Sequence, residues 1–296
     1  MDSCCTPKSL SLNVRKSGAR CGCTVPLQTT LYDTITQDNL VTQPCFRCVQ
    51  LFLGAPDTYE CRTIHHEDKL KTLEYCTKTD TTFYVHCPFT ANLAKPNSRP
   101  SINVISKELN TVAGLPAACV LHIGRVGTIA NVSHHINQIQ SSGHLPLSHH
   151  QRVPFHLLLE ISAGQGTDLG ISWEEIRHLY EGLDTTRVGL CVDTQHAFAS
   201  GMCSFQTHED VVKLFDEANA IAPKGISMIH LNDSMVQFGS HVDRHAPLRT
   251  GYIWSQSDEG LKSLIKRSKE YGMDLISETS DPIGDSKLVE RYMQTI

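Results

Sequence analysis

The sequence predicts an α/β fold, a single-domain eight-stranded (β/α)8 barrel of the TIM type. Short apolar runs recur at intervals of about thirty to forty-five residues, and polar segments with helical spacing of their apolar residues lie between them. Eight such runs are the number that closes an α/β barrel. The expected strands are residues 20–25, 47–53, 82–87, 117–122, 154–160, 187–192, 226–231 and 273–278.

The length fits one domain. The chain has 296 residues, and α/β barrels commonly run to about 250 residues or more as one domain. We expect a flexible N-terminal extension over residues 1–19 and the barrel over residues 20–296. The first twenty residues contain no apolar segment of signal-peptide length. No run approaches the roughly 20 apolar residues needed to cross a bilayer, so no membrane partner is expected.

Helix signals justify the segments between the strands. Residues 66–78 repeat apolar positions at three-residue spacing. Ser172 and Thr207 each precede acidic residues, as helix N-caps do, and the second helix is expected to run to residue 221. Gly272 follows an apolar-periodic stretch as a helix stop. Threonine and glutamine dilute the periodicity in residues 28–46, where the helical pattern is weakest.

The twelve cysteines favour a reduced, intracellular protein. A disulfide scaffold is typical of much shorter secreted chains. In addition, Cys87, Cys119 and Cys191 lie within apolar strands. Closely spaced cysteines elsewhere leave a disulfide or a structural zinc open as alternatives. These pairs are Cys4/Cys5, Cys21/Cys23 and Cys45/Cys48.

Nine histidines and carboxylates are the candidate metal ligands. They are His86, His122, Glu160, Asp193, His196, His230, Asp243, His245 and Glu278. Six of these close an apolar run, and the carboxyl ends of barrel strands meet in one pocket. Histidine and carboxylate without thiolate suit zinc or manganese in a catalytic role. Nine ligands exceed the need of one ion and suffice for three.

Two local spacings extend this pattern. Asp193 and His196 lie three residues apart, so the first can point into the barrel and the second toward a different ion. Asp243 and His245 alternate onto the same side of an extended loop. That pair, joined by His196, predicts a third metal site. Because paired ions recur in phosphodiester hydrolysis, phosphoryl transfer is the expected reaction class.

Simpler interpretations exist for the same residues. A single strand-end histidine such as His86 is more often a hydrogen-bonded core or surface residue. A carboxylate such as Glu160 or Asp193 after an apolar run needs a partner, because unpaired buried charge is costly. The remaining histidines are expected to be solvated, including His65/His66, His134/His135 and His149/His150.

The net charge must be considered together with the predicted metal ions. The formal charge of −5 disfavours binding through a broad basic surface. Three divalent ions would add +6, and −5 + 6 gives +1, with the change concentrated at the pocket. A metal-filled cleft can therefore bind phosphate on an acidic protein.

Three segments resemble the endonuclease IV family of class II apurinic/apyrimidinic endonucleases, a branch of the xylose-isomerase-like barrels. They are Glu160-Ile161-Ser162-Ala163-Gly164-Gln165-Gly166, Gly189 to His196, and His230-Leu231-Asn232-Asp233 followed by Val242-Asp243-Arg244-His245. The resemblance runs from roughly Val49 to the C-terminus. It implies hydrolysis of the phosphodiester 5′ to an abasic site in double-stranded DNA, leaving a 3′-hydroxyl, with trimming of blocked 3′ ends as a further activity.

The resemblance also implies three Zn²⁺ ions, with Mn²⁺ as the alternative metal. The first zinc would be held by His86, His122 and Glu160, with Glu160 bridging to the second. The second would be completed by Asp193, His230 and Glu278, and the third would be held by His196, Asp243 and His245. Within this set Glu160, Asp193 and Glu278 are the candidate catalytic residues.

Candidate DNA contacts lie on the loops. Phe89 stands where a family aromatic wedges into DNA, and a packed loop aromatic is the alternative. Arg244 and Arg249 are candidate phosphate contacts, although Arg249 is equally a surface charge. The sequence departs from the family pattern at Ile161, at Leu248 to Gly251, at Cys23-Thr24-Val25 and at Leu53 to Pro56. None of these departures removes a ligand.

Two rival functions remain open at this point. A sugar isomerase or epimerase on the same barrel uses similar ligands but does not need the third site. A non-catalytic DNA-damage-binding protein is disfavoured by the complete ligand set. We expect a monomer in a reducing compartment with access to DNA, the cytoplasm or the nucleus.

Overall fold

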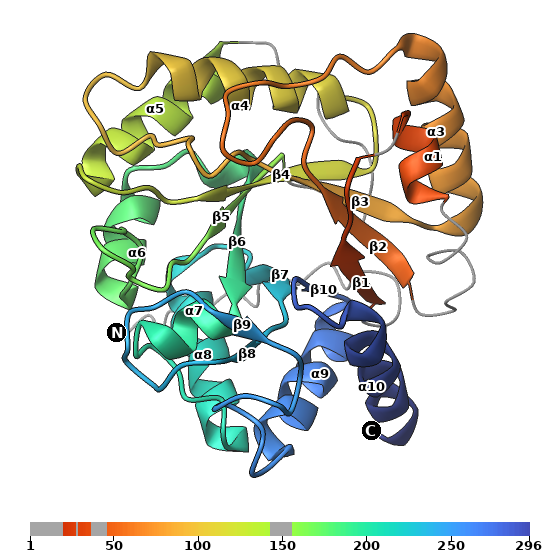
Figure 1. The fold of residues 1–296 in the computed structure, drawn as a ribbon. Coiled ribbons are helices and arrows are strands. Elements are labelled where there is room, and N and C mark those ends of the chain that lie inside the picture. Colours follow the sequence, from red (N-terminus) through yellow and green to blue (C-terminus); the bar gives the residue numbers. More distant parts are fainter. Residues whose placement is uncertain (1–19, 28, 37–45, 143–155) are drawn as a thin grey trace, which may run out of the picture.

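The eight predicted strands close into one parallel barrel in the computed structural model, which describes residues 20–27, 29–36, 46–142 and 156–296 (Figure 1). The strands are β1 (Arg20–Thr24), β2 (Phe46–Leu51), β3 (Thr82–His86), β4 (Ala117–His122), β5 (Leu157–Glu160), β6 (Val188–Asp193), β7 (Ile226–His230) and β10 (Asp274–Ser277). They follow one another around the barrel in chain order, and β10 pairs with β1 to close it. The predicted single-domain (β/α)8 fold is confirmed, whereas the proposed extension over residues 1–19 lies outside the described residues.

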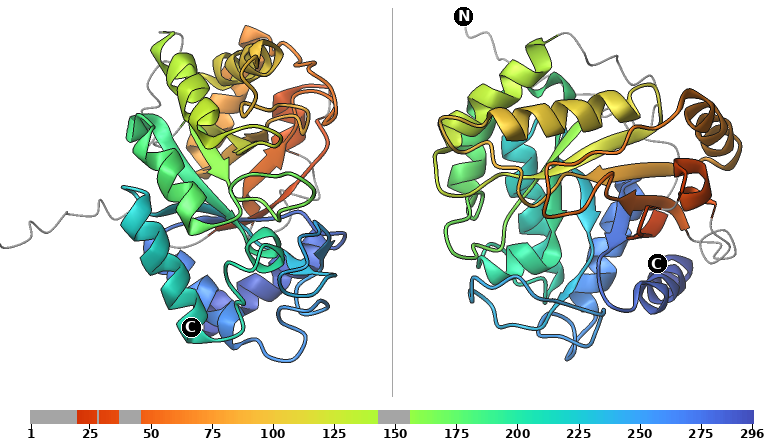
Figure 2. Two further views of the ribbon diagram at one scale, coloured as in Figure 1. Left: turned by 90° about the vertical axis from the view of Figure 1, so that its left-hand side faces the viewer. Right: turned by 45° about the horizontal axis from the view of Figure 1, so that its top comes forward.

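Helices cover the outside of the barrel (Figures 1 and 2). They are α1 (Leu31–Ile35), α3 (His66–Thr79), α4 (Arg99–Val112), α5 (Ile129–Ser141), α6 (Trp173–Glu181), α7 (Thr194–Ala199), α8 (His208–Ile221), α9 (Glu259–Tyr271) and α10 (Pro282–Thr295), with a 3-10 turn at Thr185–Arg187. The predicted caps form. Ser172 accepts from the Glu175 amide, Thr207 makes a capping box with Asp210, and Gly272 ends α9 at φ 62°.

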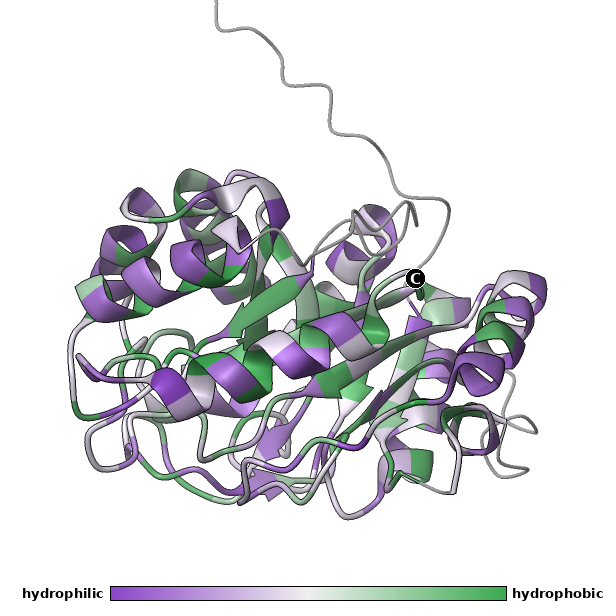
Figure 3. Ribbon diagram, turned by 90° about the horizontal axis from the view of Figure 1, so that it is seen from above, coloured by the Kyte–Doolittle hydropathy of each residue, from purple (hydrophilic) through white to green (hydrophobic). Residues whose placement is uncertain are grey.

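Apolar side chains fill two separate layers. Figure 3 shows hydrophobic strands at the centre and helices whose surfaces alternate between hydrophobic and hydrophilic. One layer lies between the strands and the helices. The other fills the barrel itself and consists of Cys48, Tyr84, Ala118, Val120, Leu158, Cys191, Met228 and Ile276. Among the described helices, none is long and apolar enough to cross a membrane.

A short antiparallel pair was not predicted. The strands β8 (Asp233–Ser234) and β9 (His245–Ala246) join the segment after β7 to the segment before α9. Two residues per strand are too few to show an alternating pattern in the sequence. The Asp233 carboxylate accepts a hydrogen bond from the Ile253 amide at 2.9 Å and so fixes the turn that follows β9. This pairing sets the position of His245 at the barrel mouth.

An ion pair closes the other end of the barrel. Arg20 on β1 contacts Asp274 on β10 with 2.6 Å between Nη2 and Oδ2, and both side chains are buried. The Thr82 and Tyr84 hydroxyls also donate to Asp274, at 2.8 and 2.7 Å. Burial opposes ionisation of Asp274, but the Arg20 charge and these hydrogen bonds hold its pKa below the usual value. The first and last strands are thereby joined by side chains as well as by backbone.

We expect Asp274→Asn to lower the free energy of unfolding by about 3–5 kcal/mol, because it leaves the Arg20 charge buried without its counter-ion. Urea unfolding at neutral pH measures the change. The matched control is Glu67→Gln, which breaks the exposed Lys71–Glu67 pair and should unfold at the same urea concentration as the wild type, because exposed ion pairs contribute little to stability. An Asp274→Asn protein as stable as the wild type would contradict the proposed role.

A buried carboxyl on α4 predicts a pH dependence of stability. Glu108 has no exposed surface, and burial raises its pKa from 4.5 to about 7, against the opposing effects of Cys87 and His86. The folded state therefore binds this proton more tightly than the unfolded state. Its contribution to stability is complete below pH 4.5 and is lost as the pH rises to about 7.

Glu108→Gln should remove this dependence. The loss of unfolding free energy between pH 4.5 and pH 8 is expected to be smaller in the variant by about 3 kcal/mol, the equivalent of the pKa shift. Urea titrations at both pH values provide the comparison. The exposed Glu174→Gln on α6 serves as a control that should follow the wild type.

Candidate metal centre

Each barrel strand directs one side chain into the mouth at its carboxyl end. These residues are Thr24, Gln50, His86, His122, Glu160, Asp193, His230 and Glu278. Most of them lie two positions after a residue of the inner apolar layer, because strand side chains alternate between the faces. Neighbouring strands bring the positions level, so that His122 pairs in register with Glu160, and Asp193 with His230. Six of the eight are the strand-end ligands predicted from the sequence.

The ligand atoms gather into three groups, each with its atoms within 4.8 Å of one another. The groups are His86, His122 and Glu160; Glu160, Asp193, His230 and Glu278; and Asp193, His196 and His245. Glu160 belongs to the first two groups and Asp193 to the last two. The first two contain the residues that the resemblance implied. The third brings in Asp193 beside the predicted His196 and His245.

Asp243, the ninth predicted ligand, lies against the third group. Its carboxylate oxygens are 3.4 Å from His196 Nε2 and 3.2 Å from His245 Nε2. The side chain is less buried than those of its partners and comes from the loop before β9. The spacing argument that placed Asp243 and His245 on one side of an extended loop therefore agrees with their positions.

Glu160 lies at the centre of the arrangement and has no exposed surface. Its Oε2 is 3.3 Å from Nε2 of both His86 and His122. Its Oε1 is 2.9 Å from His230 Nδ1. Burial opposes ionisation, but the charges on His230 and His122 lower the pKa of Glu160 well below its usual value. Glu160 is thus held as a carboxylate.

Three of the histidines are oriented by an oxygen that can only accept. His86 Nδ1 is 2.7 Å from the Cys87 carbonyl, and His196 Nδ1 is 2.9 Å from the Ile161 carbonyl. His230 Nε2 is 2.9 Å from the Gln50 side-chain oxygen. Each of these ring nitrogens must donate, which leaves the other nitrogen facing the carboxylates. This is the support that metal-binding histidines usually have.

Orphaned polar atoms show that the site fits metal ions. Glu160 Oε2, His196 Nε2 and His245 Nε2 are buried and have no hydrogen-bond partner in the described structure. Such atoms are costly unless they are compensated. Nitrogen–oxygen pairs within the three groups lie 2.9–3.9 Å apart, for example 3.3 Å between His86 and Glu160. Two ligands at about 2.0–2.1 Å from a tetrahedral zinc ion are separated by roughly 3.3 Å.

The protonation of the metal-free site reflects the same charge balance. Burial lowers the pKa of His245, but Asp193 and Asp243 raise it overall to about 9. Burial also opposes protonation of His196 and His230. Asp193, Asp243 and Glu160 nevertheless raise the pKa of His196, and Cys191, Glu278 and Glu160 raise that of His230. Protons therefore occupy the places that cations would take, and metal binding must displace them.

Sequence reasoning missed two of the eight side chains at the barrel mouth, Gln50 and Thr24, because neither is a common metal ligand. The Gln50 amide donates to Glu278 Oε1 at 2.6 Å while its oxygen orients His230. Thr24 Oγ1 donates to the same Glu278 oxygen at 3.4 Å. The available signal was the position of Gln50, a polar residue near the end of the second apolar run. The structure shows that its side chain is fully buried.

The three predicted DNA-contact residues have different surroundings. Phe89 is half exposed, and its ring centroid lies 5.2 Å from that of His86 and 5.7 Å from that of His122. Arg244 is exposed and donates to the Asp243 carbonyl. Arg249 is exposed and lies beside Asp258 and Tyr292. No DNA contact is tested by these positions, so all three remain predictions.

Similar proteins are known. Residues 46–284 match the family described as xylose isomerase-like TIM barrel. A probable endonuclease 4 of Mycoplasmopsis synoviae is 30% identical over 224 residues, covering 74% of this chain and 76% of the relative. One from Thermoplasma volcanium is 30% identical over 250 residues, covering 83% of this chain and 84% of the relative.

Solved structures share the fold. The endonuclease IV of Thermus thermophilus has a TM-score of 0.77 at 21% identity, covering 94% of this chain and all of that one. A D-tagatose 3-epimerase-like protein has a TM-score of 0.64 at 15% identity, covering 93% and 97%. At such identities the likeness concerns the fold alone.

We expect His245→Ala to reduce the metal content of the purified protein by one ion per chain, because it removes a ligand from the third group and leaves the first group complete. Elemental analysis against protein concentration measures the change. His134→Ala, at an exposed position on α5, is the matched control and should retain the wild-type content. Equal metal content in the two variants would count against the third group as a metal site.

Proposed function

This chain belongs to the endonuclease IV family of xylose isomerase-like TIM barrels, and from that we propose that it is a metal-dependent apurinic/apyrimidinic endonuclease of DNA base excision repair. It hydrolyses the phosphodiester 5′ to an abasic site and leaves a 3′-hydroxyl. Trimming of blocked 3′ ends belongs to the same proposal. Three zinc ions are the expected cofactors, with manganese as the alternative.

The shared carboxylate of Glu160 carries this proposal. It joins two ligand groups, and paired divalent ions recur in enzymes that hydrolyse phosphodiesters. Bound ions would supply Lewis-acid activation of the phosphate and of water. The chain's own contribution is to hold the side chains of Glu160, Asp193 and Glu278 at fixed positions, since a buried, preformed site costs little reorganisation during reaction.

Residues around the ligands would exclude water and position DNA. Gln50 fixes both His230 and Glu278 through its amide. Phe89 packs on the histidine rings and keeps half of its surface exposed, where an apolar wedge could replace lost base stacking. Arg244 is exposed on the loop that carries Asp243 and His245, which supports its proposed role as a phosphate contact.

The proposal includes double-stranded DNA as the partner, a monomeric enzyme and a reducing compartment with access to DNA. All nine cysteines in the described part of the chain are buried, which is compatible with such a compartment. The pairs involving Cys4, Cys5 and Cys45 lie outside the described residues.

The rival function is sugar isomerisation or epimerisation, which the fold also supports. The third ligand group, with Asp243 beside it, favours the endonuclease, because an isomerase with two metals does not need a further site built on His196 and His245. Incubation of the metal-loaded protein with aldoses tests the rival directly. Isomerisation without DNA nicking would overturn the proposal, and binding of abasic DNA without nicking would identify a non-catalytic damage binder.

We expect the wild-type protein to nick a duplex that contains one tetrahydrofuran abasic analogue. This analogue cannot undergo β-elimination, so a nick reports hydrolysis. Extension of the labelled fragment by a DNA polymerase then shows a 3′-hydroxyl. Intact duplex after incubation with fully metal-loaded protein would refute the assignment.

Glu160→Gln should lower the nicking rate by roughly a hundredfold or more, the scale of losing a main electrostatic contributor. Glu174→Gln, an exposed carboxylate on α6, is the matched control and should nick at the wild-type rate. Metal content is measured for both proteins. Wild-type nicking by Glu160→Gln would show that the shared carboxylate is dispensable.

A further inference from the structure

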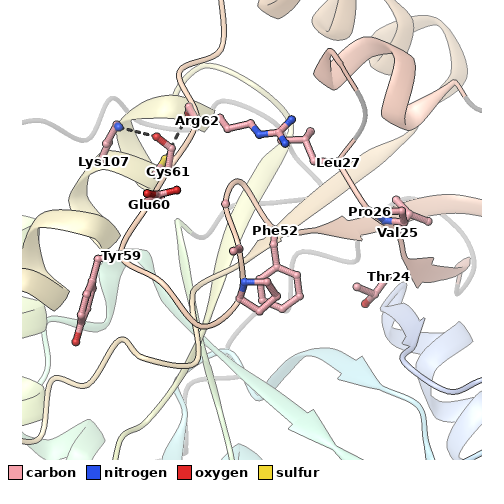
Figure 4. Close-up of a pocket in the computed structure, with 13 residues that line it drawn as sticks. Thr24, Val25, Pro26, Leu27, Phe52, Tyr59, Glu60, Cys61, Arg62 and Lys107 are labelled. Atoms are coloured by element: carbon pink, nitrogen blue, oxygen red, sulfur yellow. Dashed lines mark hydrogen bonds between the residues drawn. The ribbon is translucent and has the colours of Figure 1, made fainter.

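A large cavity opens beside the metal centre, between the segments that follow β1 and β2 (Figure 4). Its volume is about 980 Å³, at the upper end of the range for small-molecule sites. The walls combine apolar and aromatic side chains with charged ones. The residues used below are Thr24, Phe52, Pro56, Glu60, Arg62 and Lys107.

The cavity shares a wall with the metal centre. The Phe52 ring lines it and also lies 4.9 Å from the ring of His86, centroid to centroid. Thr24 lines it too, and its hydroxyl donates to the Glu278 carboxylate. A ligand in the cavity would therefore be separated from the metal ligands by one layer of side chains.

The cavity is preformed by contacts within its own walls. The Arg62 amide donates to the Leu53 carbonyl at 2.8 Å, which closes the loop after β2 on itself. Gly54 permits this closure, because a Cβ there would lie 1.9 Å from the Glu60 carbonyl oxygen. The Phe89 amide donates to the Pro56 carbonyl at 2.6 Å, so the loop is also joined to the segment after β3.

The charges and the ring faces lie at different parts of the cavity. Figure 4 shows Lys107 and Arg62 on one side and Phe52 on the other, with the Arg62 guanidinium extended toward Leu27. Arg62 and Lys107 contribute +2 and Glu60 contributes −1, so the charged groups in the wall sum to +1. Lys107 is held in place because its Nζ donates to the Cys61 carbonyl at 2.6 Å.

We propose that this cavity is a nucleotide subsite that holds one nucleotide of the DNA substrate next to the metal centre. Its base lies against Phe52 and Pro56, since ring faces accept bases without sequence preference. Its phosphate lies near Arg62 and Lys107, because guanidinium and ammonium groups bind phosphate. The shared wall favours a polymer, in which one nucleotide can occupy the cavity while a neighbouring phosphate reaches the metal centre. The proposal rests on the proposed endonuclease function.

The test is steady-state nicking of the tetrahydrofuran duplex by the metal-loaded double variant Arg62→Gln/Lys107→Gln. We expect KM to rise about tenfold, kcat and metal content to stay at the wild-type values, and the slope of log KM against log salt to fall by about 0.9, the value for one lost phosphate contact. The matched control is Lys266→Gln/Arg291→Gln, two exposed cations on α9 and α10, which should behave as the wild type. Unchanged KM and salt slope in the cavity variant would overturn the subsite.

A second measurement does not depend on how well the variant folds. Single neutral methylphosphonates are introduced along both strands around the lesion and are assayed with the wild-type enzyme. A methylphosphonate at one position should raise KM as much as the double variant does. Combining that substrate with the double variant should raise KM no further than either change alone. Absence of any sensitive position would overturn the subsite.

Titration with 2′-deoxyadenosine 5′-monophosphate separates DNA from a free nucleotide. The DNA assignment would be overturned if binding of this mononucleotide depended on Arg62 and Lys107 while the KM for the duplex did not depend on them. Failure of the wild type to nick at all would refute the endonuclease function instead, because the subsite is judged from the ratio of variant to wild type.

Discussion

A carboxylate with no exposed surface lies at the centre of the barrel mouth, and the surrounding residues must compensate its charge. Glu160 has His86, His122 and His230 within hydrogen-bonding or ion-pairing distance, and two of these rings, His86 and His230, are in turn oriented by backbone and amide oxygens. An isolated charge at this depth would cost several kcal/mol. The order of the strands, their register and the turn after β7 all bring compensating groups to this one point.

The strand ends could be predicted because two simple periodicities coincide there. Alternation along a strand places His86, Asp193 and Glu278 on the inner face, and parallel pairing brings their ends to one rim. Both rules can be read from short apolar runs. The fold and most of the candidate ligands therefore follow from local patterns. The family followed from the resemblance of three sequence segments.

Other features depended on distances that no local pattern contains. Asp193 belongs to the third group because α7 begins at once after β6, with Asp193 as its N-cap, and because His245 on β9 lies 3.6 Å from the Asp193 carboxylate. Gln50 was missed because amides are not common metal ligands, yet its side chain contacts two ligand residues, Glu278 and His230. The β8–β9 pair is too short to leave a signal, although it determines where His245 lies.

The sharing of carboxylates has a thermodynamic consequence. Because Glu160 belongs to the first and second groups and Asp193 to the second and third, cations bound in the three groups would influence one another, and the second group would connect the other two. A cation in the middle position would change the protons and charges that each neighbour encounters. Loading would then be a cooperative equilibrium of the whole mouth, in which partially filled states would differ in affinity from three independent sites.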